Sequence, residues 1–372
     1  MKIGIIGYGL RIRSLHVLLS KVFPDCKVVA IVDPRIEEIR TDLGAEAESI
    51  TFFESADEML QHMQLDGVMV GTRCDLHTDI ALKILERNLP LFLEKPVATN
   101  IYDLTRLKAG YENSKSQVVV SFPLRHTALV ELAKEIVDSG KLGTVEHVQA
   151  VNNVPYGGVY YHSWYRDEQI TGGLFLQKAT HDFDYINYLV GHKPLAICAM
   201  KSKQIFKGDK PANLKCTDCD EKYTCAESTI VNQIGEFCSF AEDTGNEDSG
   251  SALIHYESGM HLSYSQNFFA RRGAAKRGVR LLGYKGTLEF DWYTNKLEIH
   301  MHHEPRIETH QLDVDPNGHS GGDSKLLHNF IQVIRGREQS LTSLDDGLLS
   351  ALMCLKANES ANTNTFCNIN WD

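Results

Sequence analysis

The sequence predicts an α/β protein with two domains, in which a doubly wound parallel sheet precedes an α+β domain with a large sheet. Over about the first 120 residues, short apolar runs alternate with helical patterns, as in β-α-β units. After Ser121, apolar and polar residues alternate in segments joined by short glycine turns, which favours antiparallel pairing. We therefore assign residues 1–121 to the first domain and residues 122–372 to the second.

The predicted strands of the first domain are apolar runs that end at turn or polar residues: Lys2–Ile6, Lys27–Val32, Thr51–Phe53, Gly67–Val70, Pro90–Leu93 and Gln117–Ser121. Helical spacing predicts the helices Ile36–Leu43, Ala56–Gln61, His77–Glu86 and Ile101–Asn113. In the second domain a helix, Ala128–Ser139, precedes the strands Val145–Val151, Ser251–Glu257, His261–Asn267, Gly278–Leu282, Thr287–Phe290 and Lys296–His300. Two late helices are expected at Ser324–Arg335 and Asp345–Asn358, and a long polar excursion at Lys207–Asn246.

The composition limits the classes of function. With 372 residues, 42% hydrophobic and 23% charged, the chain has the make-up of a soluble globular protein. Its net charge of −11 argues against nucleic acid and anionic membranes as partners. It has no run near the roughly 20 apolar residues of a membrane helix. Nine cysteines lack the density of a secreted disulfide scaffold, so we expect a reducing, cytoplasmic compartment.

A glycine loop, Gly7-Tyr8-Gly9, lies between the first strand and the helix that follows. Gly7 would permit the tight turn, and Gly9 would let the backbone approach a pyrophosphate at the helix N-terminus, beside Leu10 and Arg11. The usual third glycine is replaced by Ile12. The sequence therefore predicts a dinucleotide site at this loop.

The choice of dinucleotide depends on two residues after the second strand. Asp33 is placed to accept hydrogen bonds from ribose hydroxyls, which favours NAD because a carboxylate repels a 2′-phosphate. Arg35 would instead pair with that phosphate, so NADP stays open beside NAD.

A lysine ends a later apolar run, in the segment Glu94-Lys95-Pro96. An ammonium group at the carboxyl edge of a nucleotide-binding sheet can position the oxygen of an alcohol while a hydride leaves its carbon. We therefore predict Lys95 to be catalytic. The alternative is an exposed lysine at a strand end.

These motifs resemble the glucose–fructose oxidoreductase, inositol dehydrogenase and rhizopine catabolism (Gfo/Idh/MocA) family. The similar segments are Gly7-Tyr8-Gly9, Asp66–Thr72 with His77, Glu94–Ala98, and Gly172-Gly173-Leu174 with His181 and Asp184. Tyr161, Trp164 and Arg166, a cysteine trio and His319–Asp323 resemble one less-studied branch. The resemblance implies a Rossmann domain, an open-faced, mostly antiparallel sheet domain, and oxidation or reduction of a secondary alcohol on a sugar-like or cyclitol substrate.

The resemblance also implies functional residues and an assembly. Cofactor contacts are expected from Gly7, Gly9, Leu10, Arg11, Asp33, Arg35, Thr72, His77, Glu94 and Lys95. Substrate contacts are expected from Arg125, Tyr161, Trp164, Arg166, Gln177, Asp184 and His319. A large apolar sheet face is rarely left in water by a monomer, so we expect a homodimer or homotetramer.

His181 is the predicted acid–base group, since a histidine pKa near 6.5 serves both directions at neutral pH. Helical spacing over Phe175–Leu189 places Gln177 and His181 on one face. Gln177 replaces the acid that the family has at this position, and a glutamine cannot take a proton. Lys178 is then either a second catalytic group or a positioning donor.

The aromatic residues Tyr156, Tyr160, Tyr161 and Trp164, with Arg166, could stack on and bind a polar ring, or they could form an aromatic core. Arg125 could touch a ligand or tie the domains together. We predict no bound metal. Cys216, Cys219, Cys225 and Cys238 form an irregular set that gives structural zinc as the alternative to free thiols.

Two other functions compete with the dehydrogenase. One is a glycoside-cleaving enzyme that retains NAD, oxidises a ring hydroxyl, eliminates across the acidified C–H bond and returns the hydride. The other is a non-catalytic sugar or dinucleotide sensor, against which Lys95 and His181 argue. Net turnover of free NAD separates the first two, and binding without turnover identifies the third. The substrate and the direction of reaction are left open.

Overall fold

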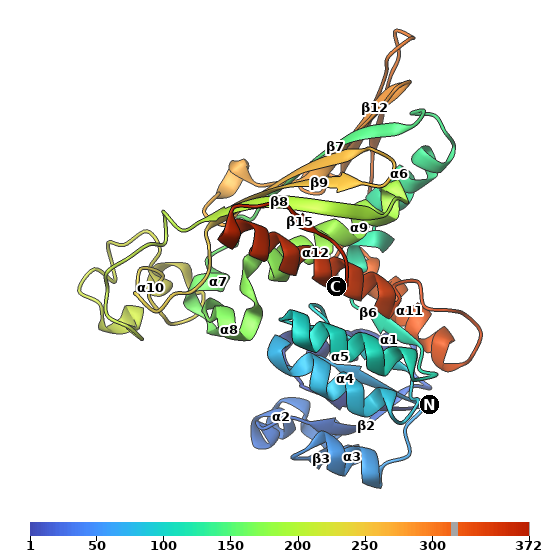
Figure 1. The fold of residues 1–372 in the computed structure, drawn as a ribbon. Helices are drawn as coiled ribbons and strands as arrows, with labels where there is room; N and C mark the ends of the chain where they lie inside the picture. Colours follow the sequence, from blue (N-terminus) through green and yellow to red (C-terminus); the bar gives the residue numbers. More distant parts are fainter. Residues whose placement is uncertain (314–318, 372) are drawn as a thin grey trace. The chain divides into compact units, whose positions relative to one another are not determined.

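The computed structural model describes residues 1–313 and 319–371 and consists of two compact units (Figure 1). The first comprises Met1–Thr127 and Asp315–Leu352, and the second comprises Ala128–Val314 and Met353–Asp372. A late segment of the chain therefore belongs to the first unit, although the sequence-based boundary places everything after residue 121 in the second domain.

The first unit is built on a six-stranded parallel sheet. Its strands are β1 (Lys2–Ile6), β2 (Lys27–Val32), β3 (Thr51–Phe53), β4 (Gly67–Val70), β5 (Leu91–Leu93) and β6 (Val118–Val120). Their order, β3-β2-β1-β4-β5-β6, is that of a Rossmann domain, in which ligands bind where the order reverses, beside β1 and β4. The predicted fold class is confirmed, and each predicted strand agrees to within a residue at either end.

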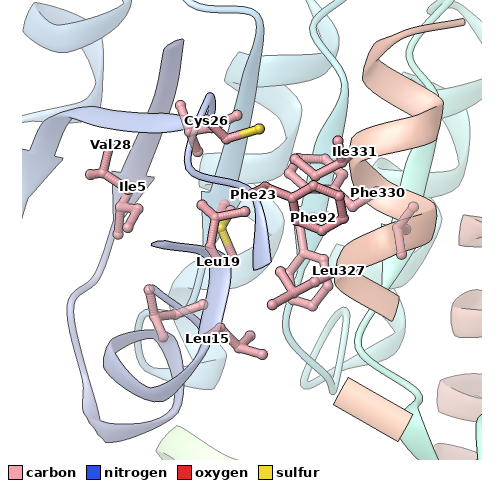
Figure 2. Close-up of a cluster of buried hydrophobic side chains, with 14 of the residues drawn as sticks. Ile5, Leu15, Leu19, Phe23, Cys26, Val28, Phe92, Leu327, Phe330 and Ile331 are labelled. Carbon is pink, nitrogen blue, oxygen red and sulfur yellow. The ribbon is translucent and has the colours of Figure 1, made fainter. Parts of the chain in front are cut away.

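Helices cover this sheet: α1 (Leu10–Val22), α2 (Ile36–Leu43), α3 (Ala56–His62), α4 (His77–Leu85), α5 (Ile101–Glu112) and α11 (Gly322–Ile334). Figure 2 shows how α11 completes the core: Leu327, Phe330 and Ile331 face Phe92 of β5. The rings of Phe92 and Phe330 lie edge to face, with centroids 5.6 Å apart.

The second unit is built on a nine-stranded sheet in the order β14-β13-β12-β11-β7-β10-β9-β8-β15. Every pair is antiparallel except β7 with β10. The strands are β7 (Val145–Asn153), β8 (Pro194–Ser202), β9 (Ser249–Tyr256), β10 (His261–Asn267), β11 (Lys276–Gly283), β12 (Gly286–Asp291), β13 (Lys296–Met301), β14 (Ile307–Gln311) and β15 (Cys367–Asn368). The large, mostly antiparallel sheet is confirmed; β8, β14 and β15 were not predicted.

Helices pack against one face of this sheet: α6 (Ala128–Asp138), α9 (Thr180–Val190) and the second half of α12 (Leu344–Thr363). The hydroxyl of Ser360 on α12 accepts a hydrogen bond from the backbone N–H of Ala199 on β8, at 2.8 Å. The opposite face bears a hollow of about 630 Å³, lined by side chains such as Leu253 and Ser265. Leu253 is 52% exposed, so this face lies open in the chain described here.

Short elements lie at one end of the second unit: α7 (Val159–His162), α8 (Glu168–Thr171) and α10 (Thr229–Asn232) (Figure 1). The predicted polar excursion belongs to this region and contains α10. Within residues 1–313 and 319–371, no helix combines the length and the apolar character needed to cross a bilayer.

Candidate active site

The glycine loop after β1 lies where the strand order of the parallel sheet reverses. Gly7 has φ +83°, and a Cβ built on it would lie 2.6 Å from the backbone nitrogen of Thr72, so only glycine fits. Gly9 is the N-cap of α1, and the nearest heavy atom to a Cβ there, the carbonyl oxygen of Gly71, is 3.9 Å away. The loop is therefore tight at Gly7 and open at Gly9, beside the exposed side chain of Leu10.

The absent third glycine has a structural explanation. In the usual motif that glycine allows helix and strand to pack closely. Here Ile12 is fully buried and its side chain contacts Gly71, just after β4, where any Cβ would collide with it. The small residue that close packing requires is therefore Gly71 at the strand end, and the helix carries the larger Ile12.

Asp33 follows β2 and is buried. One carboxylate oxygen accepts a hydrogen bond from the backbone N–H of Tyr8 at 2.8 Å, and the Arg35 guanidinium donates to both oxygens at 3.0 and 3.1 Å. Burial would raise the pKa of Asp33, but the bonds from Arg35 and Tyr8 lower it below its ordinary value. Asp33 is thus an anion in contact with the glycine loop, and Arg35 is its counter-ion.

His77 joins two of the strand-end segments. Its ring nitrogens lie 2.7 Å from the carbonyl oxygen of Pro96 and 3.3 Å from that of Thr72. Burial lowers the pKa of His77, which favours a neutral ring. The side chain therefore ties the loop after β4 to the segment after β5, where Lys95 is half-buried and its peptide bond with Pro96 is cis.

Arg11 is held by a buried acidic cluster. Its guanidinium donates to Glu94 at 2.9 Å, to both carboxylate oxygens of Asp323 at 2.6 Å, and to the hydroxyl of Ser121 at 3.0 Å. The ring of His319 lies 3.1 Å from Asp323. Burial would raise the pKa of Asp323, but the bonds to His319 and Arg11 lower it strongly. Arg11, Glu94 and His319, which were predicted as ligand contacts, thus belong to one network in the first unit.

Arg125 also lies in the first unit. It is buried, and its guanidinium is 3.0 Å from Asp346 near the start of α12. A second contact reaches the carbonyl oxygen of Leu341 at 3.5 Å. These bonds anchor the late segment of the first unit, and both lie within that unit.

The segment of the second unit that was predicted to be catalytic begins with a π-helical turn, Phe175–Ala179, that leads into α9. A π-turn bonds residue i to i+5, so the i, i+4 spacing used to align Gln177 with His181 does not hold here. Gln177 is buried and its amide donates to the carbonyl oxygen of Thr171 at 3.3 Å. His181 and Asp184 are both buried on α9.

Lys178, within the π-turn, is only 5% exposed. Its ammonium donates a hydrogen bond to the hydroxyl of Tyr156 at 2.6 Å. The same ammonium lies 4.7 Å from the ring centroid of Tyr156 and 5.7 Å from that of Tyr160. Lys178, which was predicted as a catalytic group or a positioning donor, is therefore hydrogen-bonded to Tyr156, a residue that follows β7.

Sequence reasoning missed a buried ion pair beside this segment. Arg277 on β11 donates to Asp182 on α9 at 2.9 and 2.6 Å, and Asp182 also accepts from Tyr264 at 2.8 Å and Asn152 at 2.7 Å. A signal existed: Arg277 has the same strand parity as the buried Val279 and Leu281, so it had to point inward.

The other residues predicted to contact the substrate near this segment, Tyr161, Arg166 and Trp164, each make different contacts. Tyr161 is fully buried in an apolar cluster, and its hydroxyl donates to the carbonyl oxygen of Glu247 at 2.8 Å, which supports packing rather than substrate contact. Arg166 is buried and bonds Asp243 and, at 3.1 Å, the hydroxyl of Thr244. The half-buried Trp164 stacks on a neighbouring tyrosine, with centroids 3.9 Å apart.

The four cysteines of the polar excursion are free thiols: Cys216 and Cys238 are buried, while Cys219 and Cys225 are partly exposed. Burial raises the pKa of Cys238. In the part of the chain that the structure describes, no three His, Cys, Asp or Glu side chains are placed to hold a metal ion.

The sheet edge and its loop fit a nicotinamide dinucleotide. The glycine at the N-cap leaves the first N–H groups of α1 for a pyrophosphate, and the ionised Asp33 offers an acceptor for ribose hydroxyls. Comparison with known proteins agrees. Residues 1–122 match "Oxidoreductase family, NAD-binding Rossmann fold", and residues 130–289 match "GFO/IDH/MocA C-terminal domain".

Proteins similar in sequence or in fold include oxidoreductases and dehydrogenases. YteT of Bacillus subtilis (strain 168) is 28% identical over 75% of each chain. Myo-inositol 2-dehydrogenase of Thermotoga maritima is 26% identical over 52% of this chain and 56% of its own, so this chain spans about half of that relative. A solved levoglucosan dehydrogenase, in complex with NADH and levoglucosan, shares the fold with a TM-score of 0.80 at 18% identity over 99% of each chain.

Fold, loop and matched families together define an NAD-binding oxidoreductase. The chain belongs to the Gfo/Idh/MocA family, as its motifs predicted.

Proposed function

We propose that this protein is an NAD-dependent dehydrogenase that transfers a hydride to or from a secondary alcohol of a sugar-like or cyclitol substrate. The observation that carries the proposal is the carboxyl edge of the parallel sheet, where the Gly7–Gly9 loop, Asp33 and Lys95 follow β1, β2 and β5. The inositol dehydrogenases among its relatives support this substrate class.

When bound, the nicotinamide would accept or return the hydride. Gly9 and the N-terminus of α1 would hold its pyrophosphate, with Leu10 against it, and Asp33 would bind the adenosine ribose. Thr72, His77 and Glu94 would shape the adjoining strand ends. Arg35 leaves a route to NADP, because its guanidinium could turn from Asp33 to a 2′-phosphate.

The proposed chemistry of the protein side chains has two parts. Lys95 would position the alcohol oxygen, and the region of Lys178 and His181 would exchange its proton. Substrate contacts are proposed from Trp164, Gln177 and Asp184, along with Arg125, Arg166 and His319.

Binding and turnover test the proposal in sequence. Titration of the purified protein with NADH and NADPH should show saturable binding, tighter for NADH. A panel of sugars and cyclitols with NAD should then give absorbance of the reduced nicotinamide. Failure to bind either dinucleotide would refute the proposal. Cleavage of a glycoside without net NADH would instead identify the NAD-retaining enzyme, and binding without turnover would identify a sensor.

We also propose a homo-oligomer formed through the open face of the nine-stranded sheet. Apolar side chains such as Leu253 and Met200 are exposed on its strands, and helices pack on the other face. Covering such a face is favourable, at roughly 25 cal/mol for each Å² of apolar surface removed from water.

A further inference from the structure

The ammonium of Lys178 is already engaged within the protein. It is nearly buried, it donates to the Tyr156 hydroxyl at 2.6 Å, and it faces the rings of Tyr156 and Tyr160. Tyr156, by contrast, is 46% exposed. A ligand entering this region would therefore meet the tyrosine before the lysine behind it.

We propose that Tyr156 is the acid–base residue of the substrate site and that Lys178 is the buried cation that positions and polarises its hydroxyl. The proposal rests on the dehydrogenase function above and names the group that carries the proton. It replaces direct catalysis by Lys178 and assigns the proton of the alcohol to Tyr156 instead of His181.

The charges around Tyr156 favour this role. Ionisable groups face it from several elements: Lys178, Arg277, Asp182, Tyr160 and Tyr293. The positive charge of Lys178 is the largest influence and lowers the pKa of Tyr156. Desolvation of its hydroxyl by the surrounding protein and the charge of Asp182 raise this pKa, and Arg277 lowers it further. An acid–base group works best with a pKa near the operating pH, and a phenol starts from about 10.

Neighbouring tyrosines lack this arrangement. Burial raises the pKa of Tyr160 well above its ordinary value. Burial also raises the pKa of Tyr293, to about 12. Of the tyrosines in this cluster, Tyr156 is the one that combines exposure with a hydrogen bond from a lysine in the part of the chain that the structure describes.

The alcohol would lose its proton to Tyr156 and its hydride to a bound NAD. In oxidation, the substrate O–H bond breaks and its proton forms the O–H bond of the Tyr156 phenolate. The oxygen lone pair would form the carbonyl π bond, and the carbon–hydrogen bonding pair would leave as hydride to a bound NAD. In reduction, Tyr156 returns the proton to the new alkoxide. Lys178 keeps its three protons throughout and stabilises the phenolate.

A titration of tyrosinate ultraviolet absorbance on the cofactor-free protein tests the pair without any turnover. The wild-type protein should show one tyrosine that ionises at lower pH than the others. Tyr156→Phe should remove that early step, and Lys178→Met should move it to higher pH. If Lys178→Met does not fold, Lys178→Arg is the second variant. It keeps the positive charge, so the early ionisation step should stay near its wild-type pH. An early step that survives in Tyr156→Phe would overturn the proposal.

Tyr223→Phe is the matched control. Tyr223 is exposed and has the ammonium of Lys222 at 5.6 Å from its ring centroid, but that lysine bonds the carbonyl oxygen of Thr217. Its loss should leave the early step in place. If Tyr223→Phe removes the step, proximity of any lysine suffices and the assignment to Tyr156 fails.

Kinetics complete the test. Tyr156→Phe should lower turnover by roughly 10²- to 10⁴-fold while NADH affinity stays unchanged. The pH at which oxidation reaches its plateau should rise in Lys178→Met. Near-normal turnover in Tyr156→Phe, together with its loss in His181→Ala, would return the proton to His181 and overturn the proposal. A wild-type protein that binds no dinucleotide would refute the proposed function and the catalytic role with it, whereas the titration would still decide whether the pair exists.

Discussion

Two glycines only two residues apart should respond to substitution in opposite ways. At Gly9, φ is −75° and a Cβ would have 3.9 Å to its nearest neighbour, so a Cβ meets neither backbone strain nor a clash there. Its branched side chain would occupy the space that a pyrophosphate needs at the N-terminus of α1. Gly9→Val should therefore fold normally and lose dinucleotide binding.

At Gly7 the cost falls on folding. A left-handed φ costs a non-glycine residue roughly 1–2 kcal/mol. The Cβ at 2.6 Å from the Thr72 nitrogen adds overpacking of about 1–3 kcal/mol. Gly7→Ala should therefore lower the free energy of unfolding by roughly 2–5 kcal/mol. Gly191→Ala is the control: its backbone is left-handed, with φ +67° and ψ 20°, but a Cβ meets nothing within 4 Å, so only the backbone term applies.

The assays are NADH fluorescence titration and urea unfolding of the three variants. We expect Gly9→Val to weaken NADH binding at least 100-fold, which corresponds to about 2.7 kcal/mol. Its unfolding midpoint should match the wild type. Binding within threefold of the wild type would show that the pyrophosphate does not approach Gly9, and the loop would no longer support the cofactor site.

Three further outcomes follow from contacts already described. Asp33→Ala should reduce the preference for NADH over NADPH, because it removes the ribose acceptor and releases its arginine partner; an unchanged ratio of dissociation constants would exclude Asp33 from the ribose site. Light scattering should give a dimer or tetramer at micromolar concentration, and Leu253→Asp should shift the mass toward the monomer, whereas an unaltered mass would place the interface elsewhere. The folded-state pKa of Asp323 lies below its unfolded value of about 3.9, so its contribution to stability is present above that pH and is lost as the pH falls through the acid range. Asp323→Asn should consequently lower stability at neutral pH and flatten the loss on acidification, and parallel stability–pH curves for the two proteins would contradict this.

Local patterns were sufficient for most of the first unit. Its strands end where apolar runs meet glycine or a charged residue, and the periods of strand and helix differ clearly. The resemblance of Gly7–Gly9 and Glu94–Pro96 to known motifs added the cofactor and the family. Residues whose role depends on the next few positions in the chain were therefore predictable.

Features that depend on contacts between residues far apart in the chain were not predictable from the sequence. The packing of Phe330 against Phe92 has no local signature, so the sequence could not place α11 with the first unit, where the structure has it. The π-turn looks like an α-helix in sequence because both have apolar residues at similar spacing. The bond between Lys178 and Tyr156 spans 22 positions, and only the fold could reveal it.

The placement of α11 also bears on how the chain folds as it is made. Synthesis proceeds from the N-terminus, so residues 1–127 leave the ribosome long before Leu327 and Phe330 exist. During that interval the apolar side of Phe92 and Leu19 has no helix to cover it. The Rossmann unit is consequently the first to begin folding and cannot finish until eight of the nine strands of the second unit, β7 to β14, have been translated. A nascent chain halted before Gly322 would expose this apolar surface to water and depend on chaperones. Stalled translation near the C-terminus should therefore leave the N-terminal unit incompletely folded.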